Sequence, residues 1–139
     1  MPDSSDIDSA LTATLLADAT LMAILTDGVF IDEAPPGATR FLIISLIDEE
    51  DIPQFGGRAI EDALYMVKAV ALLKTGANVA AAAARIDALL EDTTLTVAGY
   101  TVMAMHRESR IRTTEVDELD ATIRWHHRGG RYRVQCAVS

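Results

Sequence analysis

The chain has 139 residues, of which 50% are hydrophobic and 24% are charged, so its composition excludes a largely disordered protein. This length predicts one domain over residues 1–139. The net charge of −9 is uneven, because residues 1–62 hold 13 acidic and 2 basic side chains while residues 63–139 hold 8 and 10. A protein that grips DNA carries a dominant basic footprint, and this balance disfavours that class.

Targeting signals are not expected in this sequence. No apolar run approaches the roughly 18 residues that a membrane-spanning helix needs, which predicts no membrane span. The first ten residues are acidic, unlike the basic start of a secretory signal. The single cysteine, Cys136, cannot form an intramolecular disulfide, and this fits a reducing intracellular setting.

Two short helices are predicted at the start of the chain. Ser5, with Asp8 three residues later, is a weak capping box that starts a helix near Asp6. The spacing of its apolar residues places a stripe on one helical face, formed by Ile7, Leu11 and Leu15. Asp18 is expected to cap a second helix over Leu21–Leu25.

Two strands and an acidic loop follow. Val29–Glu33 is predicted as a short strand that ends before the Pro35–Pro36 pair. Arg40–Asp48 is predicted as a strand with apolar residues on both faces, which must be covered either by another subunit or within the monomer; both alternatives remain open. Residues Asp48–Gly57 carry consecutive acids, a proline and glycines, and predict a loop with Phe55 near its tip.

The middle of the chain carries conflicting signals for secondary structure. Ala59–Leu73 shows both the alternation of a strand and the apolar spacing of a helix, and propensity alone favours helix. An amphipathic helix with an alanine-rich face is predicted from Val79 to near Asp92. Thr93–Val97 and Tyr100–Met105 are then expected as short extended segments.

The C-terminal segment allows two strand pairings. In the first, Gly129 and Gly130 form a two-residue hairpin turn. One strand face then carries Ile123, Trp125, His127, Tyr132, Val134 and Cys136, and the other carries Arg124, His126, Arg128, Arg131 and Arg133. In the second, the turn lies at Thr114–Asp120 and the glycine pair is a bulge within one long strand. The residues do not decide between the two.

Catalytic chemistry is not indicated. His126 and His127 are adjacent and point to opposite faces of a strand, so no metal site is expected. No nucleophile motif or phosphate-binding glycine loop is present, and Cys136 is interpreted as a small buried hydrophobe. We therefore expect no catalytic residues, no cofactor and no enzyme activity.

Arginines in the second half are the strongest signal outside the core, and they occupy positions 107, 110, 112, 124, 128, 131 and 133. They can meet either phosphates or the acidic half of a neighbouring copy. Base stacking is poorly supported, which favours protein contact. The expected subunit or partner interface comprises Asp48, Glu49, Glu50, Asp51, Phe55, Arg124, Arg128, Arg131 and Arg133.

The order of elements resembles the tail terminator, or tail completion, family of long-tailed bacteriophages and gene transfer agents. The resemblance is carried by "LTATLLAD", "ATLMAILTDG", "VFIDEAPPGA", "RFLIISLID", an alanine-rich helix that runs into "LTVAGYTV", and "GGRYRVQC". It implies an α+β fold, with a mainly antiparallel sheet and helices packed on one face, in which Ala59–Leu73 is a strand. The sequence departs from the family pattern by a longer charged stretch over Arg112–Asp120 and by the Gly129–Gly130 pair.

The resemblance also implies a virion protein of the tail or neck, assembled in the host cytoplasm. Members form six-membered rings that cap the tail tube, end its polymerisation and join a head-side connector or stopper protein. A ring needs two complementary patches on each subunit, which the acidic and basic halves could supply. Genome DNA would pass through a negatively charged ring without sequence-specific binding. A head-closure or head-tail adaptor protein is the nearest alternative function. A small-ligand binding domain, which would require a sizeable apolar pocket in the monomer, is the next, and an enzyme is the last.

Overall fold

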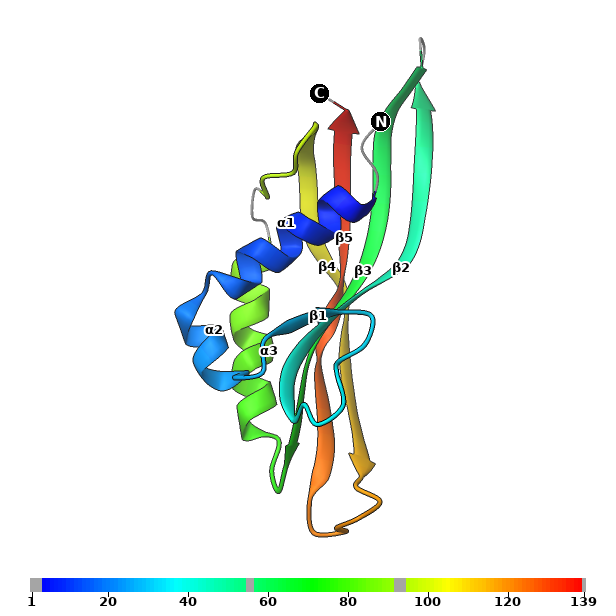
Figure 1. Cartoon of the computed structure of the whole chain (residues 1–139). Coiled ribbons are helices and arrows are strands. Elements are labelled where there is room, and N and C mark those ends of the chain that lie inside the picture. Colours follow the sequence, from blue (N-terminus) through cyan, green and yellow to red (C-terminus); the bar gives the residue numbers. More distant parts are fainter. Residues whose placement is uncertain (1–3, 55–56, 92–94, 139) are drawn as a thin grey trace.

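The computed structural model describes residues 4–54, 57–91 and 95–138 and has an α+β architecture. Its helices and strands are, in chain order, α1 (Ser4–Leu16), α2 (Ala19–Ile24), β1 (Val29–Ile31), β2 (Arg40–Gln54), β3 (Gly57–Leu73), α3 (Ala77–Leu90), β4 (Tyr100–Val116) and β5 (Arg124–Val138). The five strands form one sheet in the order β1-β2-β3-β5-β4. Only the β1–β2 pair is parallel. The helices lie on one side of a strongly twisted sheet (Figure 1), which confirms the expected fold class.

The helical layer follows the sequence pattern closely. Asp18 caps α2 as predicted, because its Oδ2 accepts a hydrogen bond of 2.9 Å from the backbone N–H of Leu21. The same carboxylate binds Arg85 of α3 at 2.6 and 2.8 Å, and this pairing is the main reason that the pKa of Asp18 is lowered. One side chain thus starts α2 and ties it to α3.

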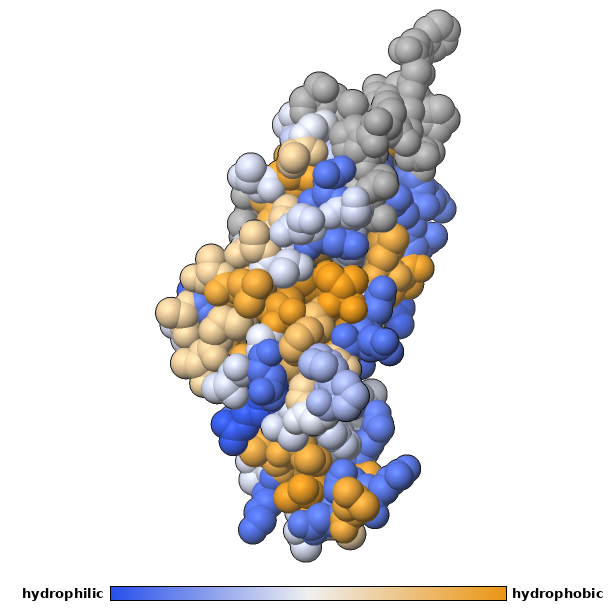
Figure 2. Space-filling view, in the orientation of Figure 1, coloured by the Kyte–Doolittle hydropathy of each residue, from blue (hydrophilic) through white to orange (hydrophobic). Residues whose placement is uncertain are grey.

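The main core lies between the helices and the sheet. The predicted stripe of α1 is fully buried there, and so are residues of α3 at helical spacing, namely Val79, Ala82, Ile86 and Leu90. From the sheet, β2 contributes Leu42 and Ile44. Each large aliphatic side chain buried in this way stabilises the fold by about 1.5–3 kcal/mol. Figure 2 shows apolar residues gathered across the middle of the helical side, and hydrophilic residues interrupted by an apolar patch along the right-hand edge.

The other face of β2 is covered in part by the chain itself. Phe41 and Ile43 are buried there with Val70. The cover comes from residues before β2 and from β5, namely Phe30, Ala34, Ala38 and Trp125. For this half of the strand, burial within the monomer is the correct alternative. Further along β2, Leu46 on the helical side and Ile47 at the register shift are 38% and 43% exposed.

The predicted acidic loop is wrong over its first part, because β2 continues through residues 48–54 as an antiparallel ladder with β3. Acidic residues and proline are rare in strands, but pairing with a neighbouring strand overrides that preference. Pro53 lies beside a register shift, where a missing N–H is tolerated. Ala59–Leu73 is a strand, as the resemblance implies, and not the helix that its propensity favours.

The C-terminal half contains two long strands that the sequence predicts only in part. Of the predicted extended segment Thr93–Val97, residues 93 and 94 lie outside the described residues, and residues 95–97 are not a strand. The predicted segment Tyr100–Met105 is the start of a longer strand, because β4 runs on to Val116. The β4–β5 turn lies after Val116, close to the second predicted pairing. The glycine pair is neither a turn nor a bulge, since Gly129 and Gly130 continue β5 in regular register.

This regular register corrects the predicted strand faces. Trp125 and His127 share a face of β5 with Arg131 and Arg133, opposite to the face that carries Tyr132 and the residues in alternation with it. The predicted apolar face and the predicted arginine face are therefore both split. A two-residue turn would have reversed the alternation, and a continuous strand keeps it.

Close approach of the strands explains the glycines. A Cβ at Gly129 would lie 2.6 Å from Lys68 Cα and nearer still to the carbonyl oxygen of Val67, and a Cβ at Gly130 would lie 2.9 Å from the carbonyl oxygen of Ser109. Only glycine allows β3, β5 and β4 to approach so closely at this point.

Candidate partner-binding site

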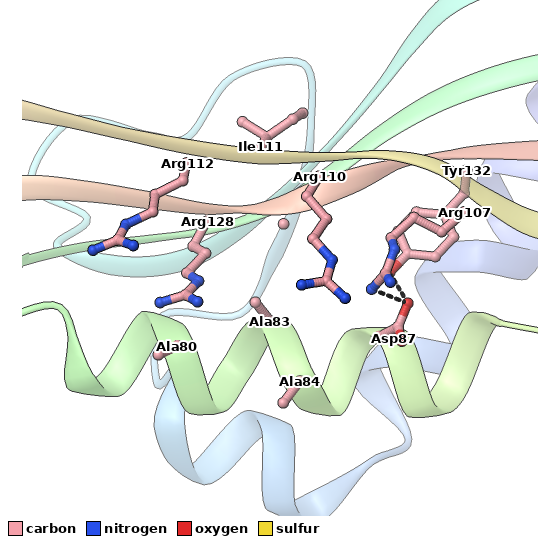
Figure 3. A pocket seen from close by; sticks show the side chains of 11 residues that line it. Ala80, Ala83, Ala84, Asp87, Arg107, Arg110, Ile111, Arg112, Arg128 and Tyr132 are labelled. Carbon is pink, nitrogen blue, oxygen red and sulfur yellow. Dashed lines mark hydrogen bonds and ion pairs between the residues drawn. The ribbon is translucent and has the colours of Figure 1, made fainter.

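A basic groove lies between α3 and the β4–β5 hairpin. Figure 3 shows Arg110, Arg112 and Arg128 pointing from the two strands toward the helix. The groove has a volume of about 480 Å³ and is lined on the helix side mainly by alanines. We call this feature, defined by Arg110, Arg112 and Arg128, the arginine groove.

Strand geometry places these three side chains together. Arg110 and Arg112 are two residues apart on β4 and therefore point to the same face, and Arg112 pairs directly with Arg128 of β5. On α3, Ala80, Ala83 and Ala84 recur at helical spacing on the facing side. Their methyl groups leave the space that the arginines enter.

One end of the groove is neutralised. Asp87 of α3 forms an ion pair of 2.8 Å with Arg107 and accepts a hydrogen bond of 3.0 Å from the Tyr132 hydroxyl. Burial, and then the charge of Asp87, raise the pKa of Tyr132. Glu91 accepts a hydrogen bond of 2.5 Å from the backbone N–H of Arg107. These contacts fix the Arg107 end.

The rest of the groove has no internal counter-charge. Within the part of the chain that the structure describes, Arg110, Arg112 and Arg128 form no hydrogen bond or ion pair with another side chain. A second hollow of about 320 Å³ shares Arg112 and Arg128 and extends to His126 near the start of α3. Three guanidinium groups in a confined groove make a site for an anion, above all for carboxylates or phosphates.

The open face of the sheet, opposite the helices, carries a different arrangement. There Arg133 of β5 binds Asp62 of β3 at 2.9 Å and Glu108 of β4 at 2.5 Å. The hydrogen bond from Arg133 is the main cause that lowers the pKa of Glu108. Arg133 therefore joins three strands within the monomer.

The acidic residues expected at the interface lie on β2, away from the groove. Asp48 and Glu50 are exposed and share the open face, while Glu49, which is partly buried, lies on the helical side. Asp51 belongs to β2. Phe55 lies outside the described residues.

The expected arginines are likewise separated. Arg124 and Arg128 point to the helical side of β5, and Arg131 and Arg133 point to the open face. Arg110 and Arg112 belong to the arginine-rich second half of the sequence but are not among the predicted interface residues. Alternation along a β4 extended to Val116 is the signal that could have placed them beside Arg128.

Metal binding and thiol chemistry have little basis in this site. In residues 4–54, 57–91 and 95–138 no three His, Cys, Asp or Glu side chains gather as a metal ion requires. Cys136 is fully buried, and burial raises the pKa of its thiol to about 11. No helix in these same ranges is both long and apolar enough to cross a membrane.

A family model described as tail completion protein gp17 matches residues 9–134. This chain belongs to that family. Its members are structural tail proteins, so the chain is a structural component of a phage-type virion and not an enzyme, as the sequence analysis expected.

Comparison with solved structures agrees on the fold. A chain from the virion of a native gene transfer agent particle is similar, with a TM-score of 0.66 and 23% identity over 95% of this chain and 96% of that one. A second solved structure has a TM-score of 0.55 and 15% identity, and covers 100% of this chain and 97% of its own. No curated protein matches the sequence.

Proposed function

We propose that this tail completion protein, acting as a single domain over residues 1–139, forms a ring on the end of the tail tube. The ring ends tube polymerisation and joins the tail to a head-side connector or stopper protein. The proposal rests on family membership together with one observation, the presence of an unpaired basic surface and an exposed acidic surface on separate parts of one chain.

Separation of the two charged surfaces favours a ring. Arg110 and Arg112 lie on the helical side of β4, whereas Asp48 and Glu50 lie on the open face of β2, with β5 and β3 between these strands. A head-to-tail contact joins two different patches of identical subunits, and repeated contacts of this kind close into a ring when the rotation permits. Six copies are proposed from the family resemblance.

DNA passage is compatible with this charge balance. Each chain contributes a net charge of −9, so the assembled ring is strongly acidic. Phosphates are repelled by such a surface, and the genome passes without sequence-specific binding. Assembly in the host cytoplasm and final residence in the virion tail or neck complete the proposal.

Tube polymerisation in vitro tests this function. Purified protein is added to polymerising tube protein of the same particle, and tube length is measured by electron microscopy. We expect growth to stop and a ring of about six times the 15.0 kDa chain mass to appear at one tube end. Tubes that grow to unchanged length contradict the proposal, and a position on the head side of the connector in particles would assign the chain to the adaptor role.

A further inference from the structure

The arginine groove requires an anionic occupant of limited width. Its walls are the alanine face of α3 and the strands β4 and β5, and it encloses about 480 Å³. A hollow of this size can receive side chains that project from a neighbouring surface. A DNA duplex does not enter it, so carboxylates fit the groove better than the phosphates of a double helix.

The acidic stretch of β2 has the matching spacing. Asp48 and Glu50 are exposed, have no hydrogen bond or ion pair within the described residues, and alternate on one face of β2. Alternate residues of a strand repeat every 6.6–6.8 Å or so. Arg110 and Arg112 alternate on β4 with the same repeat, so two carboxylates on one strand can meet two guanidinium groups in register.

The two surfaces cannot meet within one chain. They occupy opposite faces of the sheet, and β3 and β5 lie between the strands that carry them. We propose that Asp48 and Glu50 of one copy dock into the arginine groove of the next copy, where they pair with Arg110, Arg112 and Arg128. This inference rests on the proposed ring function, for which it supplies the subunit contact.

Charge reversal on each side tests the contact. The groove variant combines Arg110→Glu with Arg112→Glu, and the strand variant combines Asp48→Lys with Glu50→Lys. Each variant places like charges across every contact, so its association constant is expected to fall about 100-fold at low salt. Native mass is measured by light scattering over a range of protein and salt concentrations, and circular dichroism checks that each variant is folded.

Mixing the groove variant with the strand variant is the decisive experiment. In an alternating ring, the acidic groove of one variant faces the basic strand of the other, and the unchanged groove faces the unchanged strand. Association in a 1:1 mixture is therefore expected to return to within about threefold of the wild-type constant. Lys74→Glu and Glu33→Lys, which alter exposed charges elsewhere, are the controls and are expected to associate like wild type.

Several outcomes overturn the contact. They are unchanged association in both reversed variants, failure of the mixture to recover, or a wild-type chain that stays monomeric at every concentration. Loss of duplex DNA binding by the groove variant with unchanged ring mass would instead make the groove a phosphate site. Tube capping by the same samples separates the two proposals, because failure of the wild type to cap overturns the function, whereas capping that survives both reversals overturns only this contact.

Discussion

The arginines of β5 serve two different purposes on the two faces of one strand. On the open face, Arg133 is held by Asp62 and Glu108 and connects three strands. On the helical face, Arg128 faces a groove beside Arg112 with no carboxylate partner among the described residues. Arginine enrichment alone does not distinguish these roles, since the difference lies in what the neighbouring strands and α3 place opposite each side chain.

The comparison shows how charge is divided between folding and assembly. An ion pair within the monomer contributes to stability and is already satisfied before a partner arrives. An unpaired cluster contributes little to folding, and like charges within it repel. Its charges are available for a partner. Mutations on the open face should therefore change the free energy of unfolding, whereas mutations in the arginine groove should change association with a partner.

The largest expected effect comes from removing the close strand approach on which both faces depend. Gly129→Ala places a methyl group against the backbone of β3, and the strands must move apart. We expect a loss of about 3 kcal/mol in the free energy of unfolding, measured with urea. Gly130→Ala, whose Cβ meets the Ser109 carbonyl oxygen at 2.9 Å, should cost less. A Gly129→Ala protein as stable as wild type would show that the strands are not in such close contact.

A direct comparison of the two faces is the next test. Arg133→Ala leaves Asp62, whose side chain is 13% exposed, without its ion-pair partner, and should lower the free energy of unfolding by about 1–2 kcal/mol. Arg128→Ala removes no internal partner and should change it by less than about 0.5 kcal/mol. Urea unfolding of the two variants measures both values. Equal losses would contradict the view that Arg133 stabilises the monomer while Arg128 is left for a partner.

The smallest expected effect is a pH dependence confined to the open face. Because Arg133 lowers the pKa of Glu108 in the folded chain, the ionised form stabilises the fold above the ordinary glutamate pKa. That contribution disappears as the pH falls through the lowered folded value. The stability advantage of wild type over Glu108→Gln should therefore shrink between about pH 7 and about pH 3. A constant difference across this range would mean that the Glu108–Arg133 pair does not stabilise the folded chain.

Local sequence signals predict the helical layer better than the sheet. Asp18 and the buried stripe of α1 follow from capping preference and helical spacing, which depend on near neighbours. The strand assignment of Ala59–Leu73 came from the family resemblance and contradicted local propensity. Sheet pairing joins distant residues, so local preference carries less information about it.

Only part of the candidate site could be predicted from the sequence, again because strand pairing joins residues that are distant in the chain. The arginines stood out by number, but their faces depended on whether Gly129 and Gly130 made a turn or continued the strand. That choice is decided by the backbone of β3, which leaves no room for a Cβ. The acidic segment was recognised, yet its length as a strand depended on pairing with β3.

The short β1 strand has a consequence for the free subunit. β1 pairs with β2 only over Leu42–Ile44, so the outer edge of β2 has no partner strand over residues 45–50. Exposed strand edges are prone to aggregate by pairing with other edges. Here the edge carries Asp48, Glu49 and Glu50, and two such edges repel each other. The carboxylates that we propose bind the arginine groove of a neighbouring copy thus also disfavour edge-to-edge aggregation of free chains.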